Sequence, residues 1–277
     1  MSRSWKTTIR RSLAAAGLTA ALVTPGTAYG DGGDGTLWAA ATIEPGREGI
    51  VEVGGYEGTP LGAGSVLTLT APSTTTVTGA PFTALGYRGS VTLGGSQGTY
   101  TFEGAPATAE DSASSASSVE SESADPAGAV APESAAAWKD RKYPFILSVP
   151  ENAEPGTRLP DCALVLRDAK GRVQQKGTCT VTVGLPAPTL SHPHSGVPLS
   201  ARPKLLGSAY PGAQVTVRDA LEEEVCATTT APNGMWWCVP SNALPPGTGR
   251  LQATATLNGV SATSEQIDVV VAGAPGA

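Results

Sequence analysis

From residue 36 onward the chain alternates apolar and polar side chains with a period of two, the pattern of strands that bury one face. Residues 37–43 have apolar side chains at every odd position, and residues 65–70 alternate equally cleanly before Ala71-Pro72 interrupts them. Short strands with a turn about every eight to twelve residues are typical of a β-sandwich. The same pattern predicts further strands at 50–53, 75–78, 87–93, 98–103, 143–149, 204–209, 214–218, 224–230, 235–239, 250–257 and 266–271.

A proline-rich join, Leu185-Pro186-Ala187-Pro188, divides these predicted strands into two groups. The chain of 277 residues is long enough for two domains that each bury a core. The fold class expected is therefore all-β, with two antiparallel β-sandwiches in tandem at residues 31–185 and 186–277. Prolines in the join favour an extended, semi-rigid connection.

Residues 105–137 differ in composition from the rest, because they consist mostly of Ala, Ser and Glu. Such a segment buries too little apolar surface to offset the entropy lost on ordering. We expect it to be disordered. It is either a loop inserted into the first sandwich or a linker, and the loop is favoured because the strands that follow it look incomplete alone.

The first thirty residues resemble an export signal. They contain four basic residues and no acid, then an apolar run from Leu13 to Val23 and small residues at Ala28 and Gly30. This run is too short to span a bilayer permanently, so residues 1–30 are predicted to be a signal peptide. Cleavage is expected after Gly30, with Ala28 as the alternative. Adjacent Arg10 and Arg11 leave open twin-arginine export, although the general secretory route is favoured.

Charge excludes one class of partner. Removal of residues 1–30 takes four of the 18 basic residues and none of the 24 acidic ones, which leaves a net charge of -10. Binding to nucleic acid needs a basic surface, so no nucleic-acid partner is expected. No second apolar run reaches spanning length, and we expect a soluble exported protein without a permanent membrane span.

Four cysteines permit three disulfide pairings. Counting outward from a turn at Lys170-Gly171 pairs Asp168 with Val173, Leu164 with Gly177 and finally Cys162 with Cys179. A bridge of that size stabilises by roughly 3 kcal/mol in the chain-entropy model. The other pair, Cys226 and Cys238, stands on the two arms of a predicted hairpin that turns at Pro232-Asn233-Gly234. Two local bridges are therefore predicted, and they fit an extracytoplasmic protein.

Residues 188–272 resemble the bacterial immunoglobulin-like domains of secreted and surface proteins. The resemblance rests on Pro211-Gly212-Ala213, Trp236 between Cys226 and Cys238, and the run Leu251, Ala253, Ala255, Gly259 and Ser261. Residues 36–185 resemble such domains less closely, through residues 67–72 and 149–157. The resemblance implies an immunoglobulin-like sandwich and a role as an adhesin stalk, a spacer or an accessory module.

Trp236 and Trp237 are adjacent, and neighbouring residues of a strand point to opposite faces. Trp236 falls where the resembled family has its core tryptophan, so Trp237 is expected to point outward, where the family usually has a small polar residue. An outward indole suits contact with a sugar ring or a protein pocket. Trp237 is therefore the candidate binding residue, with Trp38 or Tyr210 as possible helpers on a polysaccharide. The alternative is that Trp237 only covers a neighbouring loop or the first domain.

Gly94-Gly95-Ser96-Gln97-Gly98 matches the letters of a nucleophile elbow, and Asp168 and His192 follow in the order of a serine hydrolase. An elbow needs a helix after the serine, whereas residues 99–102 continue as a strand. We therefore expect a hairpin turn and no catalytic residue, and a serine hydrolase is kept only as a remote alternative.

Metal sites are not expected. His192 and His194 lie in a proline-rich entry segment without evident further ligands. Asp31, Asp34 and the triplet 222–224 lack the spaced oxygen ligands of a calcium loop. The sequence thus predicts an exported, non-enzymatic protein without cofactors, secreted or loosely attached to the cell surface. It would bind or space at a cell-envelope polymer, an extracellular polysaccharide or another exported protein.

Overall fold

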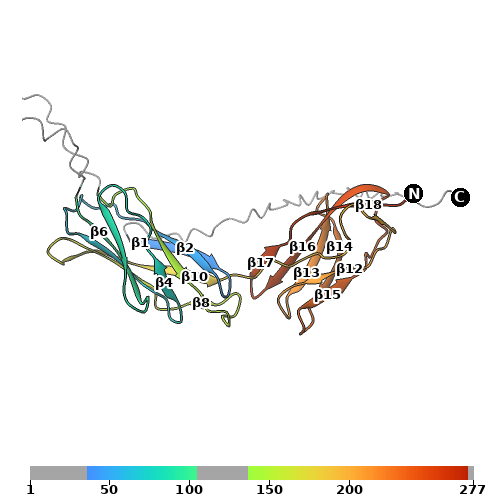
Figure 1. Cartoon of the computed structure of the whole chain (residues 1–277), viewed down its shortest axis with the longest axis horizontal. Helices are drawn as coiled ribbons and strands as arrows, with labels where there is room; N and C mark the ends of the chain where they lie inside the picture. Colours follow the sequence, from blue (N-terminus) through green and yellow to red (C-terminus); the bar gives the residue numbers. More distant parts are fainter. Residues whose placement is uncertain (1–35, 105–136, 274–277) are drawn as a thin grey trace, which may run out of the picture.

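The computed structural model describes residues 36–104 and 137–273. Within these ranges the elements are strands joined by turns, with no helix, and they form two units side by side along the long axis (Figure 1). The predicted signal peptide lies outside the described residues, as does all of the predicted insertion except Ala137. The all-β, immunoglobulin-like fold class is confirmed, because each unit consists of two sheets that pack on one core, as described below.

The first unit contains two sheets that pack on one core. One sheet has the strand order β1-β10-β9-β3-β6-β5, with the short strand β8 paired to β10, and the other has the order β2-β7-β4. The strands are β1 Leu37–Ile43, β2 Glu48–Val53, β3 Val66–Thr70, β4 Thr76–Gly79, β5 Tyr87–Val91, β6 Gln97–Phe102, β7 Tyr143–Ser148, β8 Arg158–Leu159, β9 Ala163–Arg167 and β10 Val173–Val183.

The second unit has its own pair of sheets. The larger has the order β11-β18-β16-β13-β14, with β17 paired to β16, and the smaller consists of β12 and β15. The strands are β11 Pro198–Leu199, β12 Leu205–Ser208, β13 Gln214–Asp219, β14 Glu224–Thr229, β15 Met235–Cys238, β16 Gly247–Leu257, β17 Val260–Thr263 and β18 Ile267–Val271.

Buried side chains form two separate clusters, one for each pair of sheets. The predicted faces point inward: Leu37, Ala39 and Ile43 of β1 are each buried. Leu185, which stands one residue before the expected start of the second domain, is 3% exposed and belongs to the second cluster. The chain therefore enters the second core as soon as it leaves β10.

One strand pair in each unit is parallel rather than antiparallel. β1 pairs with β10 and β11 pairs with β18, in both cases the first and last strands of their units. A parallel pair requires a long connection between its members. Here the intervening strands of the unit provide that connection. Alternation along single strands did not predict that the first and last strands of each unit pair in parallel.

The boundary of the expected insertion needs a correction at its C-terminal end. Ala137 is 3% exposed, and the next residue, Trp138, is 1% exposed. The Trp138 indole donates a hydrogen bond from Nε1 to Ser65 Oγ at 2.7 Å, and its backbone N–H donates to the Tyr87 hydroxyl at 3.0 Å. These contacts anchor residues 137 and 138 in the core of the first unit, so Ala137 is ordered.

The hairpin between β9 and β10 keeps the predicted register over most of its length. Leu164 pairs with Gly177 as predicted. Close to the turn the prediction is wrong, since Val173 pairs with Arg167 instead of Asp168. The register shifts by a bulge that follows Val173.

The side chain of Asp168 explains this bulge. Its Oδ1 accepts hydrogen bonds from the backbone N–H groups of Lys170 and Arg172, and its Oδ2 accepts from Arg172 Nε and Gln174 Nε2, all at 2.9 Å. The carboxylate therefore organises the turn together with the backbone bonds between Asp168 and residues 171 and 172, as Asp side chains commonly do. Counting outward from the turn cannot detect this additional residue.

Both disulfides join the predicted partners, but their settings differ. Cys162, directly before β9, and Cys179 of β10 join two neighbouring strands of one sheet, with Cα atoms 5.3 Å apart. Cys226 pairs in register with Val217 of β13, whereas Cys238 pairs with Leu205 of β12. The expected β14–β15 hairpin is therefore wrong as a strand pair, because the turn at 231–234 carries the chain from one sheet to the other. The second disulfide ties those two sheets together.

Candidate functional site

Strand β15 exposes a line of large apolar side chains. Met235, Trp237 and Val239 are 46%, 59% and 45% exposed, whereas the alternate residues Trp236 and Cys238 are buried in the second core. The period of two of the strand produces this division. Sequence reasoning placed Trp236 inside and Trp237 outside, and the side chains lie on those sides.

The backbone of β15 is paired on one side only among the described strands. Gly207 of β12 stands opposite Trp236, and Ala209 N–H donates to the Gly234 carbonyl at 2.9 Å. Hydrogen-bonded pairs alternate in an antiparallel ladder, so Trp236 directs its backbone groups to β12 and Trp237 directs its own to the opposite side. β15 is thus an edge strand over residues 36–104 and 137–273.

The turn before β15 protects the start of this edge. Met235 N–H donates to Asn233 Oδ1 at 3.0 Å, and the Met235 carbonyl accepts from Ala231 N–H at 2.9 Å. Asn233 and Gly234 thereby hold the corner as a tight turn, with Gly234 at φ 78°. The first position of the edge is satisfied, and Trp237 lies beyond this protection.

Lys204 lies over the indole of Trp237. Its ammonium nitrogen is 4.7 Å from the centre of the ring, within the range of a cation–π contact. The contact follows from register, because Leu205 pairs with Cys238 and Leu206 pairs with Trp237. Among the described carboxylates none forms an ion pair with Lys204. The surface made of Lys204, Leu206, Met235, Trp237 and Val239 is called the Trp237 surface below.

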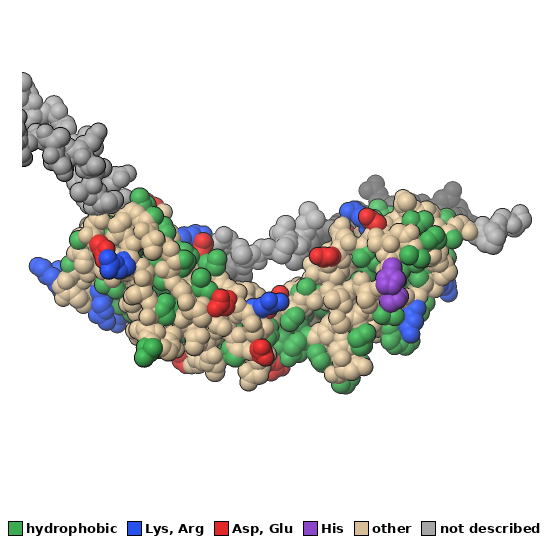
Figure 2. Space-filling model, viewed as in Figure 1, with side chains coloured by type: hydrophobic (Ala, Val, Ile, Leu, Met, Phe, Trp, Pro, Cys, Tyr) green, Lys and Arg blue, Asp and Glu red, His purple; other side chains and the backbone are tan. Residues whose placement is uncertain are grey.

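The Trp237 surface is apolar with one positive charge. Figure 2 shows hydrophobic side chains on the lower side of the second unit, where Figure 1 places β12 and β15. Sugar-binding sites add several polar groups that fix hydroxyls to their flat aromatic rings. The hydroxyl of Ser208, on the same face of β12, already bonds to Thr189 Oγ1 at 2.7 Å. The composition therefore suits an apolar protein segment better than a polysaccharide.

The two suggested helpers of Trp237 are placed differently. Trp38 is in β1 of the first unit, where the ammonium of Lys142 lies 5.8 Å from its ring centre. Tyr210 is partly buried against the second core, in the turn that precedes β13. Trp38 and Trp237 therefore belong to different units and do not form one aromatic platform.

Ser96 lies in the turn between β5 and β6, as the strand pattern predicted. Its hydroxyl is 3.2 Å from Thr92 Oγ1, and a strand, not a helix, follows it. Its carbonyl accepts from Ala71 N–H just beyond the C-terminal end of β3, whereas Asp168 follows Arg167, which pairs with the N-terminal residue of β3. His192 bridges to β12 of the second unit. The structure does not bring the three residues together as a triad.

The two histidines contact each other, with ring centres 4.4 Å apart, and the peptide bond between His192 and Pro193 is cis. The stretch 222–224 completes the turn between β13 and β14, in which Asp219 Oδ1 accepts the backbone N–H groups of Leu221 and Glu223. Within the described part of the chain, no group of three His, Cys, Asp or Glu side chains is placed to hold a metal ion. Asp31 and Asp34 lie outside that part.

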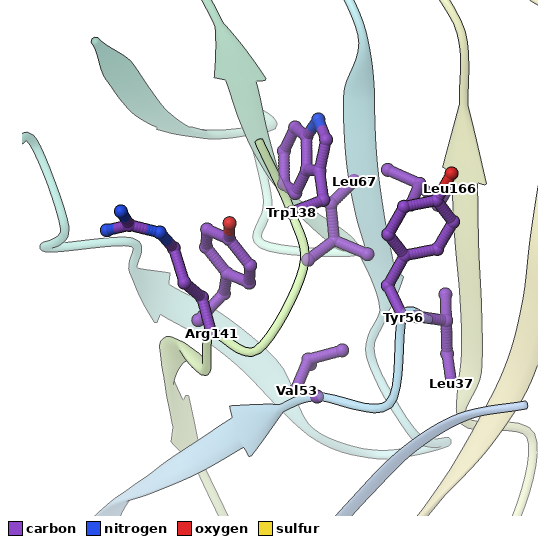
Figure 3. A pocket seen from close by; sticks show the side chains of 9 residues that line it. Leu37, Val53, Tyr56, Leu67, Trp138, Arg141 and Leu166 are labelled. Atoms are coloured by element: carbon purple, nitrogen blue, oxygen red, sulfur yellow. The ribbon is translucent and has the colours of Figure 1, made fainter. Parts of the chain in front are cut away.

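A small cavity is present in the first unit (Figure 3). Its volume is about 10 Å³, room for about one water molecule. Leu37, Tyr56 and Leu166 line one side, and Trp138 and Arg141 come from the segment that precedes β7. A substrate of ordinary size needs a far larger space. This cavity is a packing feature at the end of the core.

Comparison with known proteins gives structural similarity only. No family model matches the chain, and neither does any curated protein sequence. Similar solved structures include a biofilm-associated protein BSP domain (16% identity, TM-score 0.28, covering 86% of this chain and 29% of that one). Another is a major pilin fragment of Streptococcus agalactiae, with 12% identity and a TM-score of 0.28, covering 86% of this chain and 88% of that one. A third is the D0-D1 domain of intimin, with 8% identity and a TM-score of 0.24, covering 84% of this chain and 97% of that one.

The chain thus spans about 29% of the length of the biofilm-associated protein structure. Similarity at these TM-scores says nothing about activity or partners, and the fold assignment rests on the sheets themselves. The described residues include no helix long and apolar enough to cross a membrane.

Proposed function

We propose that this chain is an exported, non-enzymatic protein that binds or spaces at the cell envelope or the extracellular matrix, with the Trp237 surface as its contact. The predicted signal peptide and the two disulfides support export, because disulfides persist in oxidising compartments. The turn setting of Ser96 argues against a hydrolase.

The observation that carries the proposal is the alternation along β15. Three large apolar side chains at Met235, Trp237 and Val239 remain in solvent beside a strand edge that no other described strand pairs with. Proteins usually protect such edges with charge or proline, because they invite pairing with other chains. Tryptophan is also enriched among the residues that dominate binding energy. An edge with this composition is suited to recognition.

The favoured partner class is another exported protein. Half-buried Leu206 and exposed Met235 and Val239 share this face with the ring and provide apolar surface, and Lys204 provides attraction for an acidic group. A polysaccharide or a cell-envelope polymer is the alternative, in which a sugar ring would stack on the exposed face of Trp237. The two classes differ in what a pull-down will retain.

The test is a pull-down of mature protein, residues 31–277, with purified cell wall, insoluble polysaccharides and immobilised exported proteins from the same cells. We expect retention that falls at least tenfold in Trp237→Ala, as is typical of a central aromatic contact. Leu221→Ala is the matched control, because Leu221 is 79% exposed in the same unit but stands in the turn between β13 and β14, outside the Trp237 surface.

Each outcome decides between the alternatives. Retention on the protein matrix lost in Trp237→Ala supports the favoured class, and retention on polysaccharide lost in the same variant supports the carbohydrate alternative. Retention that is equal in all three proteins, or absent from all, would exclude the Trp237 surface as the contact.

A further inference from the structure

The two units touch through the turn at 154–156 of the first and the β16–β17 turn of the second. Asn258 Nδ2 donates to the Pro155 carbonyl at 3.0 Å and to Glu154 Oε1 at 3.3 Å. In Figure 1, β17 lies at the end of the second unit that faces the first. A single side chain therefore bridges residues separated by about a hundred positions in sequence.

Gly156 makes this approach possible. Its φ is 86°, a conformation that side chains rarely adopt, and a Cβ atom there would lie 2.5 Å from both Cβ and the carbonyl oxygen of Asn258. Its N–H donates to the Val183 carbonyl at 2.8 Å, which fixes the turn to the end of β10. The 154–156 turn is thus a shaped acceptor for Asn258, anchored to the strand that leads into the join.

The position of Asn258 is equally defined. It is the first residue of the two-residue turn between Leu257 and Val260, which pair in β16 and β17. Asn258 and Gly259 have φ values of 48° and 80°, as in the turns favoured by Asn-Gly. The turn fixes the backbone conformation of Asn258 and thereby directs its side-chain amide toward the first unit.

The join itself is tethered at both ends. Gly184 N–H donates to the Ile43 carbonyl and Thr189 N–H donates to the Ser208 carbonyl, each at 2.8 Å. Between these bonds stand only Leu185, which is buried in the second core, and the segment 186–188 with two prolines. Few rotatable bonds remain in the connection.

We infer that Asn258, bound to the 154–156 turn, locks the two units at one angle, so that the described chain reorients as a single rigid body. Domains that share a small interface are expected to move independently by default. Here the short tethered join removes most of that freedom, and the Asn258 amide removes the remainder. The functional value of this lock rests on the proposed function, since a fixed angle between the units sets the length that a spacer spans.

The experiment measures residual dipolar couplings of the mature chain and fits an alignment tensor to each unit separately. The test variants are Asn258→Gly, which keeps the left-handed turn but removes the amide, and Asn258→Asp, which places a carboxylate beside Glu154 and the Pro155 carbonyl. The matched control is Asn233→Gly, since Asn233 also precedes a glycine in a β-turn, but its side chain bonds within that turn, to Met235 N–H.

We expect coincident tensors in the wild type and in Asn233→Gly. In Asn258→Gly the tensor of one unit should shrink relative to the other, and in Asn258→Asp the difference should be larger. Dispersed amide resonances in both units show that each variant is folded. Unequal tensors in the wild type, or tensors in Asn258→Gly that match the wild type, would refute the lock.

The outcome is independent of the binding test. A wild-type chain with coincident tensors that retains no cell-wall or protein partner would leave the lock in place and remove the proposed contact. Retention that depends on Trp237 in a chain with unequal tensors would do the reverse.

Discussion

Lys204 directly precedes β12, the strand that pairs with β15, and its ammonium nitrogen lies 4.7 Å from the centre of the Trp237 indole. Such a contact contributes about 0.5–1 kcal/mol at an exposed site. We expect Lys204→Met, which keeps an apolar stem, to lower the free energy of unfolding by about that amount. Urea denaturation would measure it, with Lys170→Met in the β9–β10 turn as the control.

A second experiment tests whether the stabilisation by Lys204 comes from its contact with the Trp237 ring. In a Trp237→Ala background the Lys204→Met change should lose its effect, because the cation has no ring to contact. An effect of equal size with and without the indole would show that Lys204 acts through something else.

Ser65 and Trp138 form a buried hydrogen bond in the first unit. Ser65 is 0% exposed and Trp138 is 1% exposed, so removal of the hydroxyl leaves the indole N–H without an acceptor. We expect Ser65→Ala to lower the free energy of unfolding by about 1–3 kcal/mol. Ser90→Ala, whose hydroxyl bonds to Thr99 at the surface, should change it by less than about 0.5 kcal/mol. Urea denaturation of both variants tests this, and equal effects would contradict it.

Asp168 predicts a pH dependence. Burial alone would raise the pKa of its carboxyl, but hydrogen bonds from the backbone and guanidinium of Arg172 and from Lys170 N–H lower that pKa overall. A lowered folded-state pKa stabilises the protein above the unfolded-state pKa, and the stabilisation is lost as the pH falls through the folded-state value. Asp168→Asn should therefore be less stable than the wild type at neutral pH, with the difference vanishing in acid.

Denaturation at a series of pH values measures this difference. Asp268→Asn, which removes a carboxylate at an exposed site in β18, is the control. We expect it to lack the stability deficit of Asp168→Asn at neutral pH. A stability deficit of Asp168→Asn that persists unchanged in acid would show that the lost charge is not the cause.

The Cys226–Cys238 bridge joins β14 of one sheet to β15 of the other. Replacing both cysteines by alanine should cost about 2–4 kcal/mol of stability. Because β12 is the single neighbour of β15 among the strands of residues 36–104 and 137–273, we also expect the amides of β15, including that of Trp237, to exchange with solvent faster. Hydrogen exchange would measure this, and removal of Cys162 and Cys179 serves as the comparison that should leave β15 protected.

Much of the fold could be predicted from local pattern. Alternation located most strands to within a few residues, and parity along β15 was enough to separate Trp236 from Trp237. The two-residue strands β8 and β11 were missed, because a strand so short has no periodicity of its own, and the four-residue strand β17 was missed as well. The burial of Trp138 was also missed, since it directly follows a segment whose composition does not predict a core.

The features of the candidate site that were not predicted depend on pairing between strands distant in sequence. Lys204 reaches Trp237 because β12 and β15 are in register, although some thirty residues separate them in sequence. The edge position of β15 depends on the turn at 231–234, which directs the chain to the second sheet instead of folding it back on β14. Local propensity contains no information on either choice.

The parallel pair β1–β10 has a mechanical consequence. The chain enters β1 at Leu37, opposite Gly177, and leaves β10 at Val183, opposite Ile43, with seven residue pairs between the strands. Tension on the two ends of the unit would pull these strands in opposite directions along their axes, so the hydrogen bonds of the pair would bear the load together in shear instead of opening one at a time. Single-molecule stretching should therefore show the first unit yielding in one abrupt step, and gradual lengthening at low force would contradict this.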